Sequence, residues 1–564
     1  MIVLDQEQLN LLKQDLEQKW KLPPERLREA IALRFADCFD FLFNPENTFL
    51  PKDVEIGLSS LREQEIKNFK HSCQHLAPHK DEEILFLVGE GIKGIEALFF
   101  ARYLSEQNYK IRAFIFRPHS FQETTPSSSN LEFSDILSIA TASGVKLSYF
   151  NNSEDLTQYF QHYQGPGPIV IEALSEGALS QTYFDLIQAV NEQARFIISI
   201  NIPSGVCSST GICTSTAIKA NVTFSSFALQ RGHFLGRGAK KAGLVLNTTA
   251  GTAMAIRELV PSDNCFHLLN HSWFYQRSKR SPFSHKNHFG HCLVLGGSKG
   301  LVGAALLAAQ GALHVGCGLV TAATWEEHYQ EMTMRMPAEI MTGIIPSDPS
   351  SAQKALDRLY RYDSLVIGPG LGRTQKTFEL VASLLLNFQG PIILDADALH
   401  VFSFYDQISL LRKRVGPILV TPHYGEFAKM MKIPVETILE NPIEHLRNFV
   451  RDLGINTILK GPATLLGFTS GEKAINYGPN SALGKGGSGD LLAGILGGLM
   501  AQLRISSSTD SSTQKQLSFV EQACLGVYLH SLTGKLASQH FGERALKISD
   551  LLDSLPLAFK HCQV

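Results

Sequence analysis

The chain shows two patterns of apolar residues. In the first 80 residues apolar side chains recur at steps of three and four, as in "LREAIALRFADCFDFLF", which predicts helices. From residue 84 onward, short continuous apolar runs predict buried strands: "EILFLVGEG", "KIRAFIF", "PIVIEALSEG" and "FIISINIPSG". The run "IEALFFARYLSEQ" between the first two predicts a helix. Buried strands that alternate with helices are typical of a mostly parallel sheet covered on both faces.

The same alternation starts again near residue 291. There "HCLVLGGSKG" predicts a strand that ends in glycines, and "LVGAALLAAQGALHVGCG" predicts a helix rich in small residues. Four more strands follow in "SLVIGPGLG", "PIILDADAL", "PILVTPH" and "NTILKGPATLLG", each ending in Gly, Pro, Asp or His. Because ligands of open α/β sheets bind at the carboxyl ends of the strands, these ends predict the rim of one site.

Between the two halves, over residues 255–290, the pattern disappears into polar residues and prolines. We place a domain boundary there and predict two α/β domains, 1–265 and 266–564. The serine-rich segment 506–516 is expected to be a solvated loop.

Length and composition agree with this division. A chain of 564 residues is too long for one core, and 44% hydrophobic with 18% charged residues is typical of a globular protein. The net charge of −2 gives no attraction to nucleic acid or to an anionic membrane. No signal peptide or membrane-spanning window is visible. The nine cysteines stand singly without a CxxC pair, so we expect reduced thiols, a cytoplasmic location and no zinc site.

One glycine-rich stretch, "ALGKGGSGDLLAGILGGL" at 482–499, suggests chemistry. Glycines lead directly to Asp490 and then to a helix with apolar residues at helical spacing. Bare amides at a helix N-terminus attract an anion, and Asp490 beside them could accept a proton. The alternative is a tight turn before a core helix.

The order of the motifs then carries a family resemblance. "HKNHFGHCLVLGGSKG", "IGPGLG", "LDADAL", "TPHYGEF", "KGPAT" and "GGSGD" together resemble the ribokinase-like ADP-dependent NAD(P)HX dehydratases. The first half resembles the YjeF-type NAD(P)HX epimerase domain that bacterial repair enzymes carry fused to the dehydratase. The resemblance implies a Rossmann-like three-layer αβα domain followed by a ribokinase-like αβα domain. It covers nearly the whole chain and is most specific in residues 285–556.

The resemblance also implies the reaction. These enzymes restore NADH and NADPH that have been hydrated at carbon 6 of the nicotinamide ring; one domain interconverts the two epimers, and the other dehydrates the S form at the expense of ADP. The small-molecule partners implied are NADHX, NADPHX and ADP, with Mg²⁺, in a homo-oligomer. The residues do not distinguish ADP from ATP or NADH from NADPH.

Site residues carry over from the dehydratase motifs. Asp490 would be the base that takes the proton from the substrate hydroxyl, and the loop amides would stabilise the transferred phosphoryl group. The residues expected to bind ADP are Lys460, Gly461, Pro462, Ala463, Thr464, Gly487, Ser488 and Gly489. Lys485, where the family carries a small or hydroxyl residue, either neutralises phosphate charge or is an exposed lysine.

The hydrated dinucleotide has its own expected residues. They are Gly303, Ala304, Gly370, Gly372, His423 and Asp490, with Glu426 near His423. For the glycines the alternative is close packing of helix and strand, and for His423 it is a structural role. Asp395 and Asp397 either orient Mg²⁺ through water or cap the next helix.

The first half departs from its family. Where the family reads Gly-Pro-Gly-Asn-Asn-Gly-Gly-Asp-Gly, this chain reads "GEGIKGIEA" at 89–97. At the degenerate epimerase site stand Lys93, Glu96, Glu172, Asn201 and Ser204, of which only Ser204 is an expected K⁺ ligand. An amide at position 201 cannot act as a carboxylate base, so we expect epimerase activity to be lost.

Lys93 takes the place of a K⁺-coordinating asparagine. Its ammonium could fill the vacant cation site with Glu172 as partner, which makes bound K⁺ doubtful. Two other functions stay open: the second half could be a kinase for a small molecule such as a vitamin precursor, and the first half a binding or assembly module.

Overall fold

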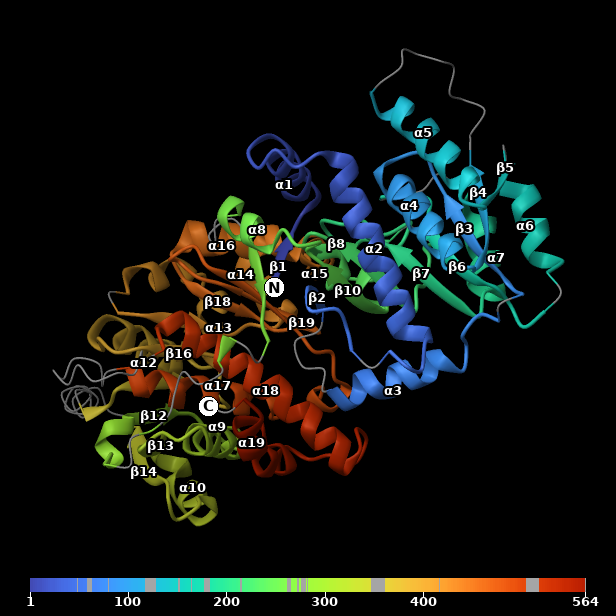
Figure 1. Ribbon diagram of the computed structural model, residues 1–564. Helices are drawn as coiled ribbons and strands as arrows, with labels where there is room; N and C mark the ends of the chain where they lie inside the picture. The colour runs from blue at the N-terminus through green and yellow to red at the C-terminus, as the bar shows by residue number, and fades with distance from the viewer. Residues whose placement is uncertain are drawn as a thin grey trace. The chain divides into compact units, whose positions relative to one another are not determined.

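A computed structural model gives the structure of the chain (Figure 1). It describes residues 1–47, 49–57, 63–79, 81–116, 128–150, 153–163, 165–176, 183–213, 216–260, 265–270, 273–274, 280, 283–345, 361–414, 416–503 and 517–562. The serine-rich segment 506–516 lies outside these residues, as does much of the patternless stretch between the halves.

The chain divides into two compact units, Met1–His267 (unit 1) and Leu268–Val564 (unit 2). The boundary that we derived from the sequence, 265/266, stays a prediction. All nine cysteines are free thiols. None of the described helices combines the length and the apolar composition that crossing a bilayer requires.

Unit 1 contains a sheet with the strand order β2-β10-β8-β7-β6-β3-β4-β5. All neighbours are parallel except β2, which runs antiparallel to β10. The strands are β2 (Val54–Ile56), β3 (Glu83–Val88), β4 (Lys110–Phe116), β5 (Lys146–Phe150), β6 (Ile169–Ala173), β7 (Phe196–Ile200), β8 (Val222–Ser226) and β10 (Leu244–Thr248). Outside this sheet, β1 (Ile2–Leu4) pairs with β9 (Leu229–Gln230) and β11 (Phe266–Leu268).

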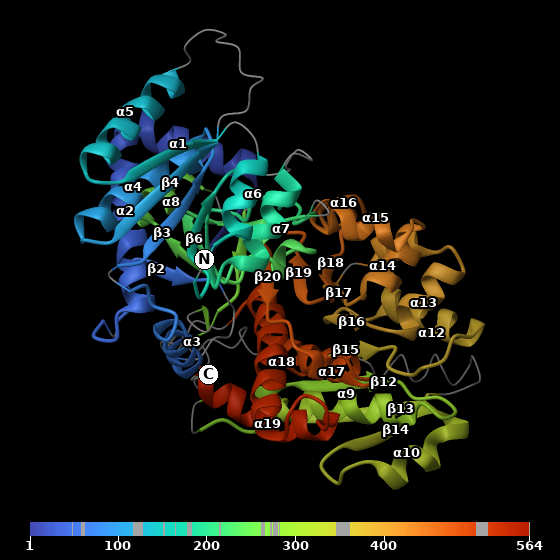
Figure 2. The ribbon, with the colours of Figure 1, turned by 90° about the vertical axis from the view of Figure 1, so that its right-hand side faces the viewer.

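Alternating side chains of these strands face two helical layers. In β3, one core contains Ile84, Phe86 and Val88 together with α2, α4 and α5, and another contains Leu85 and Leu87 together with α6 and α7. Figure 2 shows the two groups of helices on opposite sides of the sheet. The helices are α1 (Gln6–Gln18), α2 (Pro24–Phe43), α3 (Glu63–Gln74), α4 (Ile92–Glu106), α5 (Ser128–Ala142), α6 (Ser153–Gln161), α7 (Phe184–Gln193) and α8 (Ala253–Leu259). Unit 1 is therefore a three-layer αβα unit.

Unit 2 is built around strands in the order β14-β13-β12-β15-β16-β17-β18-β19-β20. They are parallel from β14 to β18 and antiparallel from β18 to β20. The strands are β12 (His291–Leu295), β13 (Leu319–Trp325), β14 (Met341–Ile345), β15 (Ser364–Ile367), β16 (Ile392–Leu394), β17 (Ile418–Val420), β18 (Asn456–Leu459), β19 (Ala463–Gly467) and β20 (Lys473–Tyr477).

Helices cover both faces of this sheet as well. One core joins alternate strand residues to α9, α17, α18 and α19, and α12, α13, α14 and α16 lie on the opposite face (Figures 1 and 2). The helices are α9 (Val302–His314), α10 (Tyr329–Arg335), α12 (Gln375–Asn387), α13 (Asp397–Phe404), α14 (Tyr424–Met431), α15 (Val435–Glu440), α16 (Pro442–Leu453), α17 (Ser488–Ala501), α18 (Phe519–Phe541) and α19 (Ile548–Cys562).

The predicted α/β fold with two αβα layerings is confirmed. The expected strands and the helix of residues 92–106 lie in the apolar runs that predicted them. The helical reading of the first 80 residues missed two strands, β1 and β2, because three residues are too short to show an alternating pattern.

Strand order brings particular loops together. In unit 1 the order reverses between β3 and β6, and in unit 2 between β12 and β15. At such a switch point the loops leave in opposite directions and open a crevice at the carboxyl edge of the sheet. Gly303 and Gly370 of unit 2 and Lys93 of unit 1 follow strands that flank these crevices, and other candidate residues follow strands farther along the same edges, such as β16 to β18 in unit 2 and β7 in unit 1.

Candidate active site

The glycine-rich loop of unit 2 ends at the N-terminus of α17. Gly487 is the N-cap with a φ of 97°, in the left-handed region that glycine adopts readily, and Asp490 is the third residue of the helix. Ser488 is buried, and its hydroxyl lies 3.1 Å from His530 Nε2 on α18. Burial lowers the pKa of His530 to about 4, so this imidazole is neutral and holds Ser488 in place through hydrogen bonds. No motif in the sequence pointed to His530.

Lys460 and Asp395 form an ion pair beside this loop. The Lys460 ammonium lies 2.7 Å from Asp395 Oδ1, which also accepts a hydrogen bond of 2.8 Å from the Thr421 hydroxyl. A Cβ atom on Gly489 would lie 3.3 Å from Lys460 Nζ, so the cation borders the first turn of α17. The strand ends of β16, β17 and β18 thus meet the α17 N-terminus, as the pattern of strand ends predicted.

The pKa values of this cluster are shifted. Burial raises the pKa of Asp490 to about 6, helped by the Asp395 charge and opposed by Lys460. Burial alone would lower the pKa of Lys460, but the Asp395 carboxylate and the charge of Glu426 outweigh it and raise that pKa above its ordinary value. A carboxylate that titrates near pH 6 is suited to accept a proton at neutral pH.

The "KGPAT" motif is the turn between β18 and β19. The Thr464 hydroxyl donates to the Gly461 carbonyl at 3.1 Å, and the Gly461 amide donates to the Thr464 hydroxyl oxygen at 3.4 Å. Gly461 packs against the Tyr424 ring with no room for a side chain. Pro462 and Ala463 complete a compact turn that fixes Lys460 at the edge of the site.

His423 is the N-cap of α14. Its Nδ1 accepts hydrogen bonds from the amides of Gly425 (3.0 Å) and Glu426 (3.2 Å), and the Glu426 carboxylate accepts one from the His423 amide (2.9 Å). This capping box gives His423 a structural role, while its side chain stays 60% exposed. A single parallel bridge sets His423 beside Lys460.

The small residues expected at the dinucleotide lie together at the switch point. Gly370, with a φ of 60°, packs so tightly that a Cβ atom would lie 2.6 Å from the Leu301 carbonyl oxygen and 3.1 Å from the Ala304 side chain. A Cβ atom on Gly303 would meet only Arg335, at 3.7 Å. Close packing therefore explains Gly370 but not Gly303, whose role at the dinucleotide stays a prediction.

Asp397 supports the neighbouring loop. Its carboxylate accepts hydrogen bonds from the Gly372 amide (3.0 Å) and from Arg373 Nε (2.7 Å). The N-cap of α13 is Ala396, without a side-chain cap, so neither Asp395 nor Asp397 caps this helix. Within the described ranges no three His, Cys, Asp or Glu side chains gather as a metal cluster.

Lys485 is half-buried, and the two roles that we considered for it stay predictions. Its ammonium donates to the carbonyl oxygens of Arg544 (2.9 Å) and Leu546. The lysine therefore ties the glycine-rich loop to the segment before α19.

The degenerate site of unit 1 is buried and internally satisfied. Glu96 and Asn201 are each 1% exposed, and Asn201 Nδ2 donates to Glu96 at 2.7 Å. Burial raises the pKa of Glu96, opposed by the charge of Lys13 on α1, 3.9 Å away. Asn201 Oδ1 accepts from the Ser226 hydroxyl at 2.9 Å, and His233 Nε2 donates to the Asn201 carbonyl at 2.6 Å. Lys13 and His233 were not found by sequence reasoning because no motif contains them.

The ion pair predicted between Lys93 and Glu172 is present, with Lys93 Nζ 3.1 Å from Glu172 Oε1. The Ser204 hydroxyl lies 3.1 Å from the same ammonium.

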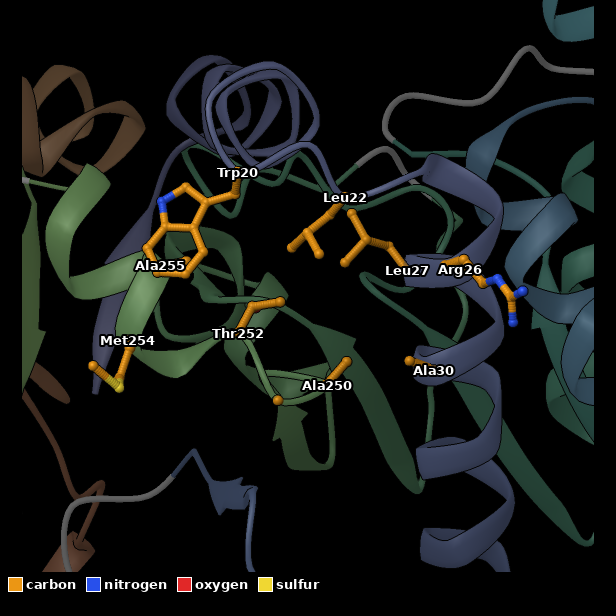
Figure 3. Close-up of a pocket in the computed structure, with 10 residues that line it drawn as sticks. Trp20, Leu22, Arg26, Leu27, Ala30, Ala250, Thr252, Met254 and Ala255 are labelled. Atoms are coloured by element: carbon orange, nitrogen blue, oxygen red, sulfur yellow. The ribbon is translucent and has the colours of Figure 1, made fainter.

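A separate hollow of about 440 Å³ in unit 1 contains none of the predicted site residues. Trp20, Leu22, Leu27 and Met254 give it apolar walls, and Figure 3 shows the Arg26 guanidinium turned away from it.

Comparisons with known proteins match both units. The family model for NAD(P)H-hydrate dehydratase matches residues 292–557, and the model for the YjeF-related protein N-terminus matches residues 64–232. The bifunctional NAD(P)H-hydrate repair enzyme Nnr of Moorella thermoacetica is 30% identical over 497 residues, which cover 86% of this chain and 88% of that protein. The enzyme of the same name from Dictyoglomus turgidum is 27% identical and covers 99% of this chain and 98% of its own.

A solved structure is also similar. The ADP/ATP-dependent NAD(P)H-hydrate dehydratase of Bacillus subtilis, co-crystallised with ATP and Mg²⁺, is 28% identical, covers 53% of this chain and 99% of its own, and gives a TM-score of 0.44. From the family matches and the near full-length relatives, we conclude that this chain belongs to the family of bifunctional NAD(P)H-hydrate repair enzymes and carries an NAD(P)H-hydrate dehydratase in unit 2.

Proposed function

We propose that unit 2 dehydrates the S form of hydrated NADH and NADPH with ADP as phosphoryl donor, and that Asp490 is the base. The observation that carries this is the cluster at the α17 N-terminus. A carboxylate with a pKa of about 6, a lysine cation and the first turn of α17 at Gly489 lie together there. These groups match the three needs of phosphoryl transfer to a hydroxyl: a base, a cation and donors for the developing charge.

The proposed chemistry has two stages. The oxygen of the carbon-6 hydroxyl attacks the β-phosphorus of ADP, its proton passes to Asp490, and AMP leaves with the electron pair of the broken P–O bond. The carbon–oxygen bond then breaks with its electrons going to phosphate, and loss of a proton from carbon 5 forms the ring double bond of NAD(P)H. Lys460 and the α17 N-terminus hold the transferred group, because both carry positive charge: the ammonium is one donor that a phosphate would share with Asp395, and the helix N-terminus is the positive end of the helix dipole.

Mg²⁺ fits this site as an ion that arrives with the nucleotide. Asp395 and Asp490 are the carboxylates beside Lys460, and the described residues contain no ready metal cluster. Mg²⁺ typically keeps waters and uses one or two carboxylates with substrate phosphates. When bound, it would supply charge neutralisation on the phosphates.

The test is recovery of NADH absorbance from the pure S hydrate with ADP and Mg²⁺. In Asp490→Asn the rate should fall by roughly 10²–10⁴-fold while ADP still binds, because the amide cannot accept the proton. Asp363→Asn is the control. This carboxylate accepts a hydrogen bond from the His291 amide at the amino edge of the sheet, opposite the carboxyl edge where Asp490 lies. Near-full turnover of Asp490→Asn would contradict the assignment. A phosphorylated product that accumulates without phosphate release would instead support a small-molecule kinase.

For unit 1 we propose that the epimerase activity is lost. What supports this is the burial of Glu96, Glu172 and Asn201, each at most 1% exposed and each already bound to neighbouring side chains. A base for epimerisation must reach carbon 6 of the substrate. A buried carboxylate that already accepts hydrogen bonds from neighbouring residues cannot reach that atom.

A further inference from the structure

Lys93 ends inside a cage of oxygen atoms. It is the second residue of α4, next to the switch point of unit 1, and its side chain is 2% exposed. Five oxygens lie between 2.7 and 3.2 Å from its Nζ: both carboxylate oxygens of Glu172, the Ser204 hydroxyl, and the backbone carbonyls of Ser175 and Ile202.

These oxygens favour a cation over a neutral amine. A neutral amine would turn its lone pair toward one of them, and carbonyl and carboxylate oxygens have no proton to offer it. Burial lowers the pKa of Lys93, and the Glu172 carboxylate opposes that effect. The cage is also rigid: Glu172 is fully buried and accepts from the Leu174 amide (2.8 Å) and the Ser199 hydroxyl (2.9 Å).

The dimensions of the cage identify the kind of ion that it suits. Ca²⁺ holds oxygen ligands at about 2.3–2.6 Å and Mg²⁺ at about 2.0–2.1 Å, both shorter than the contacts around Nζ. One carboxylate balances one positive charge. A monovalent ion about as large as an ammonium group, such as K⁺ or NH₄⁺, matches both the size and the charge.

We infer that the Lys93 ammonium is a tethered cation that occupies an oxygen site for a monovalent ion, so that unit 1 needs no K⁺ and gains a K⁺ site when the ammonium is removed. The residues present therefore do not fit a bound K⁺ beside Lys93. The inference goes beyond the proposed dehydratase and does not depend on it, because the site lies wholly within unit 1.

The experiment follows thermal unfolding of the full chain in KCl and in choline chloride at equal ionic strength. The wild-type protein should show no difference between the two salts. In Lys93→Ala we expect the midpoint of the transition that unfolds unit 1 to rise saturably in KCl, by about 2–4 °C or more, because an ion that binds only the folded state stabilises it. Calorimetric titration of Lys93→Ala with KCl should find one site, and the wild type none.

Lys70→Ala is the matched control. Lys70 is 7% exposed and donates to the Asn47 carbonyl, and within the described part of the chain no carboxylate pairs with it. Its removal should lower the midpoint equally in both salts.

A double variant keeps the test valid if Lys93→Ala, which leaves the buried Glu172 carboxylate without its cation, does not fold. Lys93→Met with Glu172→Gln removes both buried charges and should show no K⁺ response. The inference is overturned if Lys93→Ala unfolds at the same midpoint in both salts, if it stays unfolded in saturating KCl while the double variant folds, or if the double variant responds to K⁺ as the single variant does.

Discussion

At the scale of single residues, the site of unit 2 is a balance of buried charges. Asp490, Asp395 and Lys460 share one edge of the sheet, so a change in one carboxylate alters the titration of the other groups. The raised pKa of Asp490 means that the charged carboxylate lowers the stability of the folded protein, since burial disfavours the charged form. The same shift makes the carboxylate a better proton acceptor near neutral pH.

Stability and activity should therefore depend on pH in opposite ways. The pKa of Asp490 rises from 3.8 to about 6 on folding, so its contribution to stability is fully present below about pH 4 and is lost as the pH passes 6. At about pH 8 Asp490→Asn should be more stable than the wild type, by up to about 3 kcal/mol, and below pH 4 equally stable. Scanning calorimetry from pH 4 to pH 8 measures the stability difference between the variant and the wild type. A difference that does not change with pH would contradict the raised pKa of Asp490.

The dehydratase rate of the wild type should fall as the pH drops through about 6, because protonated Asp490 cannot act as the base. The pH profile of kcat/KM, taken with the S hydrate in limiting amount, shows whether this limb is present.

Lys460→Ala should weaken nucleotide binding more than binding of the hydrated dinucleotide. The ammonium borders the α17 amides, where the proposed phosphates lie, and loss of one charge-assisted contact costs roughly 1.5–3 kcal/mol. Calorimetric titration with each ligand compares the losses. Equal losses would place Lys460 outside the nucleotide site.

At the scale of elements, close contact between α17 and α9 positions the helix that carries Asp490. Gly494 and Gly498 of α17 lie against the backbone of Ala308 and Ala312 on α9, where a Cβ atom would overlap it. Gly494 and Gly498 therefore serve the packing of the two helices, whereas Gly497 between them lies against Val366 of β15 and Cys292 of β12.

Gly494→Ala should destabilise unit 2 by about 1–3 kcal/mol, because overpacking forces the helices apart. The control is Gly303→Ala in α9, where the new methyl group would meet only Arg335 at 3.7 Å, and it should be neutral or stabilising. Urea denaturation measures both. Equal destabilisation by the two substitutions would show that helix packing is not the cause.

At the scale of the whole molecule, the two units share an architecture and differ in the state of their switch points. In unit 2 the residues at the strand ends include a half-exposed glycine loop and an exposed His423 side chain. In unit 1 the corresponding residues are buried and paired with one another. This difference supports the proposed loss of epimerase activity in unit 1.

The whole protein should then depend on another source of epimerase. Given the pure R hydrate, ADP and Mg²⁺, it should recover NADH no faster than the hydrate epimerises spontaneously. An added authentic epimerase should accelerate the recovery, because the supply of the S form then no longer limits the proposed reaction of unit 2. If the added enzyme changes nothing, Glu96 or Glu172 acts as a base and unit 1 is active.

Local sequence determined which residues stand at the strand ends. Apolar runs bounded by Gly, Asp or His are set by burial of the strand and the turn that follows, so β3, β6, β12 and β15 to β18 and the residues after them could be predicted. The family motifs added the roles of Asp490 and Lys460, and those roles stay predictions.

Tertiary structure decided which distant side chains contact the residues at the strand ends. His530, Lys13 and His233 come from helices and loops far along the chain, and no local pattern marks a side chain whose partner is distant. The same holds for Lys485, which binds backbone carbonyls of residues 544 and 546. For Lys93, the family resemblance predicted the pairing with Glu172. Only folding brings two carbonyls and a hydroxyl around the ammonium, because β3 lies beside β6 and β6 lies beside β7 in the sheet.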